Sequence, residues 1–91
     1  MTTRTVSVAS TVGLHARPAA LFVKEVSESG ISVTITKVGG GKTVNAASLL
    51  AVMSLGVKHN EEVELASDAD GADEILNRLV AFLQIDHDAE G

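Results

Sequence analysis

Alternating polar and apolar residues predict four short β-strands along this chain. Residues 5–8 alternate strictly, and residues 31–36 carry the clearest alternation in the sequence. Residues 42–44 follow a triple-glycine turn at 39–41, so the two flanking strands are expected to form an antiparallel hairpin. A last strand is predicted at residues 62–66. Because strands whose apolar residues recur at every second position have one buried and one solvent-exposed face, we expect an antiparallel sheet.

A period of three to four residues predicts helices between these strands. The first follows His15 and ends before Gly30, the second spans residues 46–55, and the third follows Gly71. The order β-α-β-β-α-β-α predicts an α+β fold with the helices on one face of the sheet. Pattern alone leaves the strand order open, with a ferredoxin-like split β-α-β sheet as the first choice. The apolar stripes are Ala19, Phe22, Val23 and Val26 in the first helix, and Ile75, Leu76, Leu79, Val80 and Leu83 in the third.

Composition and charge narrow the class of protein. A length of 91 residues with 45% hydrophobic residues fits one globular domain, here 1–91, with residues 86–91 expected as a frayed acidic tail. Seven basic and twelve acidic residues give a net charge of −5, which argues against nucleic-acid binding. No cysteine is present, so thiolate metal sites and disulfides are excluded. No signal peptide or apolar membrane span is visible, and we expect a cytoplasmic protein without membrane insertion.

His15 is the candidate chemical group because of its place before the first helix. The backbone N–H groups of Ala16 and Arg17 have no partner within such a helix, and the helix dipole is positive there. The Arg17 guanidinium adds a fork that suits a phosphate group. These features favour an imidazole nucleophile that receives a phosphoryl group; the alternative is that His15 only caps the helix. His59 and His87 are expected to be solvated, and the spacing of the histidines predicts no metal site. We also expect no cofactor.

Two segments resemble one known family. Residues 13–19, Gly-Leu-His-Ala-Arg-Pro-Ala, resemble the active-site motif of HPr, the phosphocarrier of the bacterial phosphoenolpyruvate:sugar phosphotransferase system. Residues 41–56 resemble the regulatory-serine region of the same family. The resemblance covers nearly the whole chain in length and element order. It implies an HPr-like open-faced sandwich, with a four-stranded antiparallel sheet in the order 1-4-2-3 and three helices on one face.

The resemblance also implies a function. His15 would accept a phosphoryl group on its Nδ1 atom from enzyme I and pass it to sugar-specific IIA domains, while Arg17 contacts that group. The protein would be a carrier and not an enzyme with its own small substrate. We expect a monomer, because each predicted strand and helix finds a partner within one chain. The alternatives are a regulatory interaction protein of the same fold controlled at Ser48, or a carrier for a nitrogen-related phosphotransferase branch.

The second predicted helix is apolar on every side, which a small domain cannot bury completely. Leu49, Leu50 and Met53 are therefore candidates for an exposed docking patch beside His15, with Lys24 as a nearby basic residue. The resemblance supports partner docking by these residues. The remaining large apolar side chains of this helix, Val52 and Leu55, are expected in the core.

Ser48 has two interpretations. It matches the serine that an ATP-dependent HPr kinase modifies in some HPr proteins, and serine is also a favoured helix cap. The sequence departs from the family pattern at Ala47, where a basic residue is common, and at Val12, where a small polar residue is common. The first departure bears on recognition by a kinase, and the second on hydrogen bonding around His15. The triple-glycine turn is longer than usual, and we assign it no function.

Overall fold

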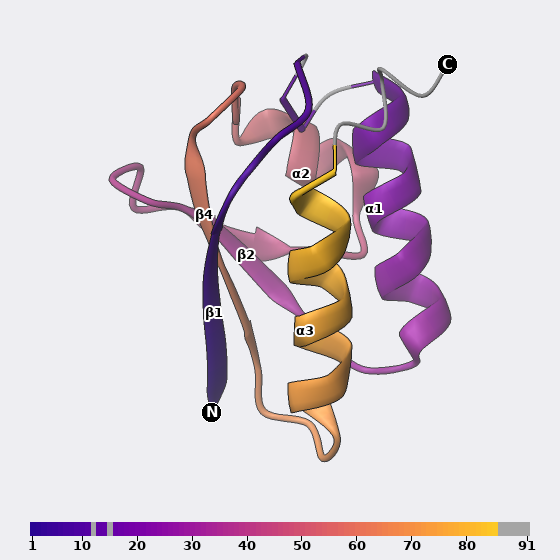
Figure 1. Ribbon diagram of the computed structural model, residues 1–91. Helices are drawn as coiled ribbons and strands as arrows, with labels where there is room; N and C mark the ends of the chain where they lie inside the picture. The colour runs from indigo at the N-terminus through magenta and orange to yellow at the C-terminus, as the bar shows by residue number, and fades with distance from the viewer. Residues whose placement is uncertain (12, 15, 86–91) are drawn as a thin grey trace.

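One sheet and a layer of helices build the protein. In the computed structural model, which describes residues 1–11, 13–14 and 16–85, four antiparallel strands lie in the order β1-β4-β2-β3 and are accompanied by three helices. Figure 1 shows the helices on one side of the sheet. The elements are β1 (Thr2–Ser7), α1 (Ala16–Ser29), β2 (Thr34–Lys37), β3 (Thr43–Asn45), α2 (Leu49–Ser54), β4 (Glu62–Ser67) and α3 (Ala72–Leu83).

The strand order is the one that the HPr resemblance implies and that the alternation pattern left open. Both β1 and β2 pair with β4 in antiparallel fashion. They therefore run parallel to each other with β4 between them, which is a split β-α-β arrangement. Pairing β1 with β4 joins the first and last strands of the chain, a contact that no local pattern encodes.

Side chains on the helix-facing side of the sheet form the core. Val6 of β1 lies opposite Val63 of β4, and Ile35 of β2 lies opposite Leu65 of β4 and Val44 of β3. All but Val44 are buried, and Val44 packs against the cluster from the edge strand. Burial of this aliphatic surface, which contributes about 25 cal/mol per Å², is the main driving force for folding.

The first and third helices meet through aromatic packing. Phe22 of α1 is fully buried, and its ring centroid lies 6.3 Å from that of Phe82 in α3. The tilt of 46° between the rings is an ordinary geometry for an aromatic pair. These are the two aromatic residues of the chain, so the rest of the core is aliphatic, as the composition indicates.

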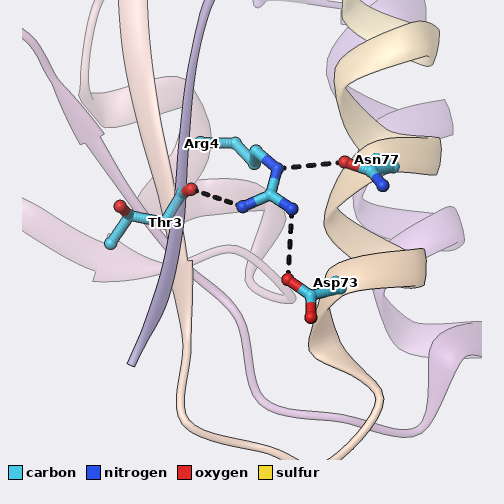
Figure 2. Close-up of polar contacts among 4 residues, drawn as sticks. All are labelled: Thr3, Arg4, Asp73 and Asn77. Atoms are coloured by element: carbon cyan, nitrogen blue, oxygen red, sulfur yellow. Dashed lines mark hydrogen bonds and ion pairs between the residues drawn. The ribbon is translucent and has the colours of Figure 1, made fainter.

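Arg4 ties β1, an edge strand, to α3 (Figure 2). Its Nε donates to Asn77 Oδ1 at 3.0 Å, and Nη2 lies 3.1 Å from Asp73 Oδ1. Nη1 donates to the carbonyl oxygen of Thr3 at 2.8 Å. The strand and the helix are thus joined through one guanidinium at the edge of the core. An exposed ion pair of this kind contributes about 1 kcal/mol or less, so the packing of apolar side chains contributes more to the attachment of α3.

Three elements begin three residues away from the predicted start. Strand β1 begins at Thr2 and not at residue 5. The second helix begins at Leu49 and not at residue 46, because Ser48 has an extended backbone and caps the helix from there. Before it, Asn45 Oδ1 accepts a hydrogen bond from the Ala47 N–H at 2.9 Å. This local bond, together with Ser48 N–H to Asn45 O at 3.1 Å, makes a turn between β3 and the helix. Strand β2 begins at Thr34 although the alternation starts at residue 31; Val33 still faces the core.

Within the described residues, no helix is both long and apolar enough to cross a membrane.

Candidate functional site

The candidate site lies at the N-terminal end of α1. The helix begins at Ala16, directly after His15, which lies outside the described residues, as do Val12 and residues 86–91 with His87. Arg17 is exposed in the first turn, where backbone N–H groups have no carbonyl partner within the helix. Pro18 in the same turn loses no helical hydrogen bond. The helix dipole and the Arg17 charge both favour an anionic group at this end.

The loop between β1 and α1 is anchored to the loop between α2 and β4. The Leu14 N–H donates to the carbonyl oxygen of Val57 at 3.0 Å, and the Leu14 side chain is buried. Gly13, with φ of +71°, packs directly on this segment: a Cβ there would lie 2.7 Å from Lys58 Cα and closer still to the Val57 oxygen. The residues that lead into the candidate site are therefore held by backbone contacts.

Ser10 marks the other end of the same loop. Its carbonyl oxygen accepts from the Gly13 N–H at 3.0 Å and lies 3.1 Å from His59 Nδ1. The residue is 3% exposed, and its Oγ has no hydrogen-bond partner among the described residues. His59 is exposed, as expected, yet it has this specific contact. Sequence reasoning missed the contact because its two residues are 49 positions apart, and no local pattern signals it.

The turn that carries His59 is stabilised by Glu61. Glu61 Oε1 accepts from the Lys58 N–H at 2.8 Å and lies 3.2 Å from Lys37 Nζ. These contacts lower the pKa of Glu61 below its usual value, with the hydrogen bond from the Lys58 backbone as the largest cause, while partial desolvation opposes the shift. Asn60 adopts a left-handed conformation with φ of +68°, and its N–H donates to Val8 O at 2.8 Å.

Helix α2 carries the predicted docking residues. Leu50 is 83% exposed and Leu49 is 39% exposed, whereas Met53 is half-buried against the core. The exposed patch is therefore centred on Leu49 and Leu50. Helices α1 and α2 contact each other, so the helix that carries this patch lies beside α1. The two residues expected in the core, Val52 and Leu55, are buried.

On α1, Lys24 follows Arg17 by seven residues, or about two helical turns, so both exposed side chains lie on one face.

Ser48 is the N-cap of α2. Its backbone is extended, with φ of −105° and ψ of 113°, and its Oγ accepts from the Ala51 N–H at 3.4 Å. The capping interpretation is therefore confirmed by geometry. Ser48 is partly exposed and directly precedes the Leu49–Leu50 patch.

The described residues contain no group of three or more His, Cys, Asp or Glu side chains arranged to hold a metal ion.

Comparison with known proteins places these features in one family. The family model described as the PTS HPr component phosphorylation site matches residues 2–84 of the chain. The phosphocarrier protein HPr of Streptomyces coelicolor is 52% identical over 83 residues, which are 91% of this chain and 88% of that protein. A crystal structure of HPr from Bacillus anthracis has a TM-score of 0.85 at 37% identity, covering 91% of this chain and 96% of that one. A crystal structure of the Bacillus subtilis catabolite repression protein Crh, described as a domain-swapped dimer, has a TM-score of 0.71 at 40% identity over 92% and 94% of the chains.

Proposed function

The chain belongs to the HPr family of phosphocarrier proteins, and from that premise we propose that His15 is the residue that carries the phosphoryl group. Nδ1 of His15 attacks the phosphorus atom of a phosphohistidine on enzyme I; the N–P bond of the donor breaks as the new N–P bond forms. A sugar-specific IIA domain then removes the group by the same exchange. The carrier serves sugar uptake and ends each cycle unchanged.

The observation that supports this proposal is the position of Arg17 at the N-terminal end of α1. It is exposed in the first turn of α1, two residues after His15 and inside the segment that the family model matches. Its guanidinium and the adjacent N–H groups suit the charged oxygens of a phosphoryl group. An exposed cradle holds the group without strongly stabilising the phosphorylated state, and tight stabilisation of that state alone would lower its transfer potential. The protein therefore acts as a stoichiometric carrier and not as an enzyme, and it needs no cofactor.

The test is intact-mass measurement after incubation with phosphoenolpyruvate and enzyme I. We expect one added phosphoryl group that is lost in acid and kept in base, as for a phosphohistidine. His15→Ala removes the acceptor and abolishes this gain in mass, while His87→Ala, the matched control, retains it. A phosphoryl group that persists in His15→Ala would move the acceptor to another residue. No uptake by the wild-type chain from its own organism's enzyme I would refute the carrier proposal for His15.

Partner docking follows from the exposed apolar patch. Enzyme I and IIA domains must each reach His15 in turn, so both need a common surface beside α1. Leu49 and Leu50 supply exposed apolar area, and the half-buried Met53 lies on the same helix. Lys24 and Arg17 add positive charge. A nitrogen-related branch would use the same surface, and the enzyme I variant that phosphorylates the chain distinguishes the two branches.

A regulatory role for Ser48 is the second candidate function, favoured by its position next to Leu49 and by the similarity to Crh. A phosphate on Ser48 adds up to two negative charges at the edge of the docking patch. Incubation with ATP and an HPr kinase tests this role. Uptake of an acid-stable phosphate that is absent in Ser48→Ala supports it, whereas failure to take up phosphate removes Ser48 as a kinase site.

The proposed unit is a cytoplasmic monomer in which residues 1–91 form one HPr domain. The family model spans residues 2–84, and one core cluster includes side chains from both β1 and α3. Absence of cysteine suits a reducing compartment. Light scattering on the purified chain is expected to give the monomer mass of 9.4 kDa. Twice that mass would favour a dimer such as the one described for Crh.

A further inference from the structure

We propose that His59 is a positioning residue for phosphoryl transfer, because it holds the loop that leads into His15. Its Nδ1 lies 3.1 Å from the carbonyl oxygen of Ser10, the residue at which this loop begins its turn. The inference rests on the proposed function, since it takes His15 as the acceptor. It adds a residue from the α2–β4 loop, remote in sequence, to the groups that determine how His15 is presented.

The α2–β4 loop contacts both ends of the segment before His15. At the far end, the His59 ring meets Ser10 O; at the near end, Val57 O accepts from the Leu14 N–H at 3.0 Å. Gly13 lies flat against Val57 and Lys58 between these two contacts. Without the His59 contact, the Ser10 carbonyl would lose its link to the α2–β4 loop, while the backbone hydrogen bonds of Val8, Ala9 and Leu14 would remain. Leu14 is bonded directly to His15, so movement of the segment moves the acceptor.

The chemistry of the contact defines the state of the His59 ring. Ser10 O is an acceptor, so Nδ1 must carry the proton, and the neutral ring is then the Nδ1–H tautomer. The same Ser10 oxygen also accepts from the Gly13 N–H at 3.0 Å. One lone pair therefore accepts from the Gly13 N–H within the turn, and the other accepts from the His59 ring. Ser10 Oγ has no hydrogen-bond partner among the described residues. The carbonyl of Ser10, and not its hydroxyl, is therefore the Ser10 group that contacts the α2–β4 loop.

His59 is itself held by a well-defined turn. The Lys58 N–H donates to Glu61 Oε1 at 2.8 Å, and the Glu61 N–H donates to Lys58 O at 3.1 Å. Asn60, in the left-handed region, donates its N–H to Val8 O at 2.8 Å and so joins the turn to the end of β1. A ring carried on such a turn can fix its partner, whereas a ring on an unconstrained loop could not.

The expected kinetic effect is on the rate of transfer and not on docking. Small displacements of a reacting atom are costly because transfer needs a near-attack geometry. The Leu49–Leu50 patch lies on α2, whereas His59 hydrogen-bonds to the loop before α1, so partner affinity should not change. Removing the ring should therefore lower kcat for phosphorylation by enzyme I and leave KM unchanged.

Three substitutions at position 59 provide the test. His59→Ala removes the donor, His59→Asn places an amide nitrogen close to where Nδ1 lies, and His59→Gln places one where Nε2 lies. We expect kcat about two- to tenfold lower for His59→Ala and His59→Gln, the effect of one ordinary hydrogen bond. His59→Asn should retain kcat within about twofold of the wild type. Equal kcat for all three variants, or a loss that appears only in KM, would overturn the proposal.

A second measurement does not depend on phosphorylation. Two-bond ¹H–¹⁵N spectra of the whole protein report the tautomer of each histidine, and we expect neutral His59 as Nδ1–H. A predominant Nε2–H tautomer would refute the hydrogen bond even if transfer were impaired. If wild-type protein accepts no phosphoryl group at His15, the proposed function fails, and the role of His59 in transfer fails with it. If the wild type accepts the group and the variants match it, only the inference about His59 fails. Thermal melting of each variant identifies a loss of rate that is due to unfolding.

Discussion

Gly13 and Val57 lie so close together that the fold has no room for a side chain at position 13. Their neighbours in sequence, Leu14 and Lys58, complete the contact: Leu14 donates its N–H to Val57 O, and Lys58 Cα would lie 2.7 Å from a Cβ on Gly13. This contact joins the loop before the candidate acceptor to the loop before β4. It explains why glycine suits position 13 of this chain, two residues before His15.

Gly13→Ala should lower the free energy of unfolding by at least about 2 kcal/mol, because strain at positive φ and steric overlap add. Gly30→Ala is the matched control. Gly30 also has positive φ, +76°, but a Cβ there meets nothing within 4 Å, so a loss of about 1 kcal/mol is expected. Urea unfolding measures both variants. Equal losses would show that crowding at Val57 is not the reason for glycine.

Arg17→Ala should slow phosphoryl transfer about 10- to 100-fold, which is the effect of losing a charge-assisted hydrogen bond. Arg17→Lys keeps the charge and loses the planar fork, so its rate should lie between those of the wild type and the alanine variant. Rapid-quench kinetics gives the rate, and titration calorimetry gives the affinity for enzyme I. A drop in affinity with an unchanged transfer rate would make Arg17 a docking residue instead.

Substitutions at Leu50 and Val52 should have different effects, one on partner binding and the other on stability. Leu50 is 83% exposed and Val52 is fully buried in the same helix. Leu50→Ser is expected to leave the free energy of unfolding within about 0.5 kcal/mol and to weaken binding of enzyme I more than about fivefold. Val52→Ala should cost about 2 kcal/mol of stability with little change in affinity. Unchanged binding in Leu50→Ser would place the docking surface elsewhere.

Two buried serines differ in their hydrogen bonding. Ser67 Oγ donates to Ser32 O at 2.6 Å and accepts from the Ala69 N–H at 3.2 Å, whereas Ser10 Oγ has no partner among the described residues. Ser67→Ala should therefore cost about 1–2 kcal/mol, because it leaves a buried acceptor and donor without that partner. Ser10→Ala should be neutral or stabilise by up to about 1 kcal/mol. Calorimetric unfolding tests both, and equal destabilisation would show that the hydrogen bonds of Ser67 do not make the difference.

Glu61 should make stability depend on pH. Its hydrogen bond from the Lys58 N–H, with the nearby Lys37, holds its pKa below the usual 4.5. A pKa that is lower in the folded state means that Glu61 stabilises the protein above its unfolded-state pKa, and that this contribution disappears as pH falls through the folded-state value. The stability difference between the wild type and Glu61→Gln should thus shrink from about pH 7 to about pH 3. A difference independent of pH would show that ionisation of Glu61 does not matter.

Local features of the chain were sufficient to predict most elements and part of the site. Residue periodicity indicated which face of each strand and helix is buried, because burial needs only a repeating apolar stripe. Arg17 follows the candidate acceptor by two residues in the chain. Its place in the first turn of α1 could therefore be predicted from the expected start of the helix. The predicted start of α2 was wrong because Ser48 has an extended backbone and caps the helix, so that residues 46–48 stay outside it.

Tertiary structure alone decided how distant segments meet. The β1–β4 pairing depends on the whole sheet. Residue periodicity indicates which face of a strand is buried, but it does not indicate which strand lies beside it. Met53 and Leu50 look equivalent in sequence, yet only packing of α2 against α1 and the core decided that Leu50 stays exposed. The contact of His59 with Ser10 exists because the sheet brings the loops before α1 and β4 together. Thus the chain by itself determined the chemistry near position 15, while long-range packing determined how that chemistry is held.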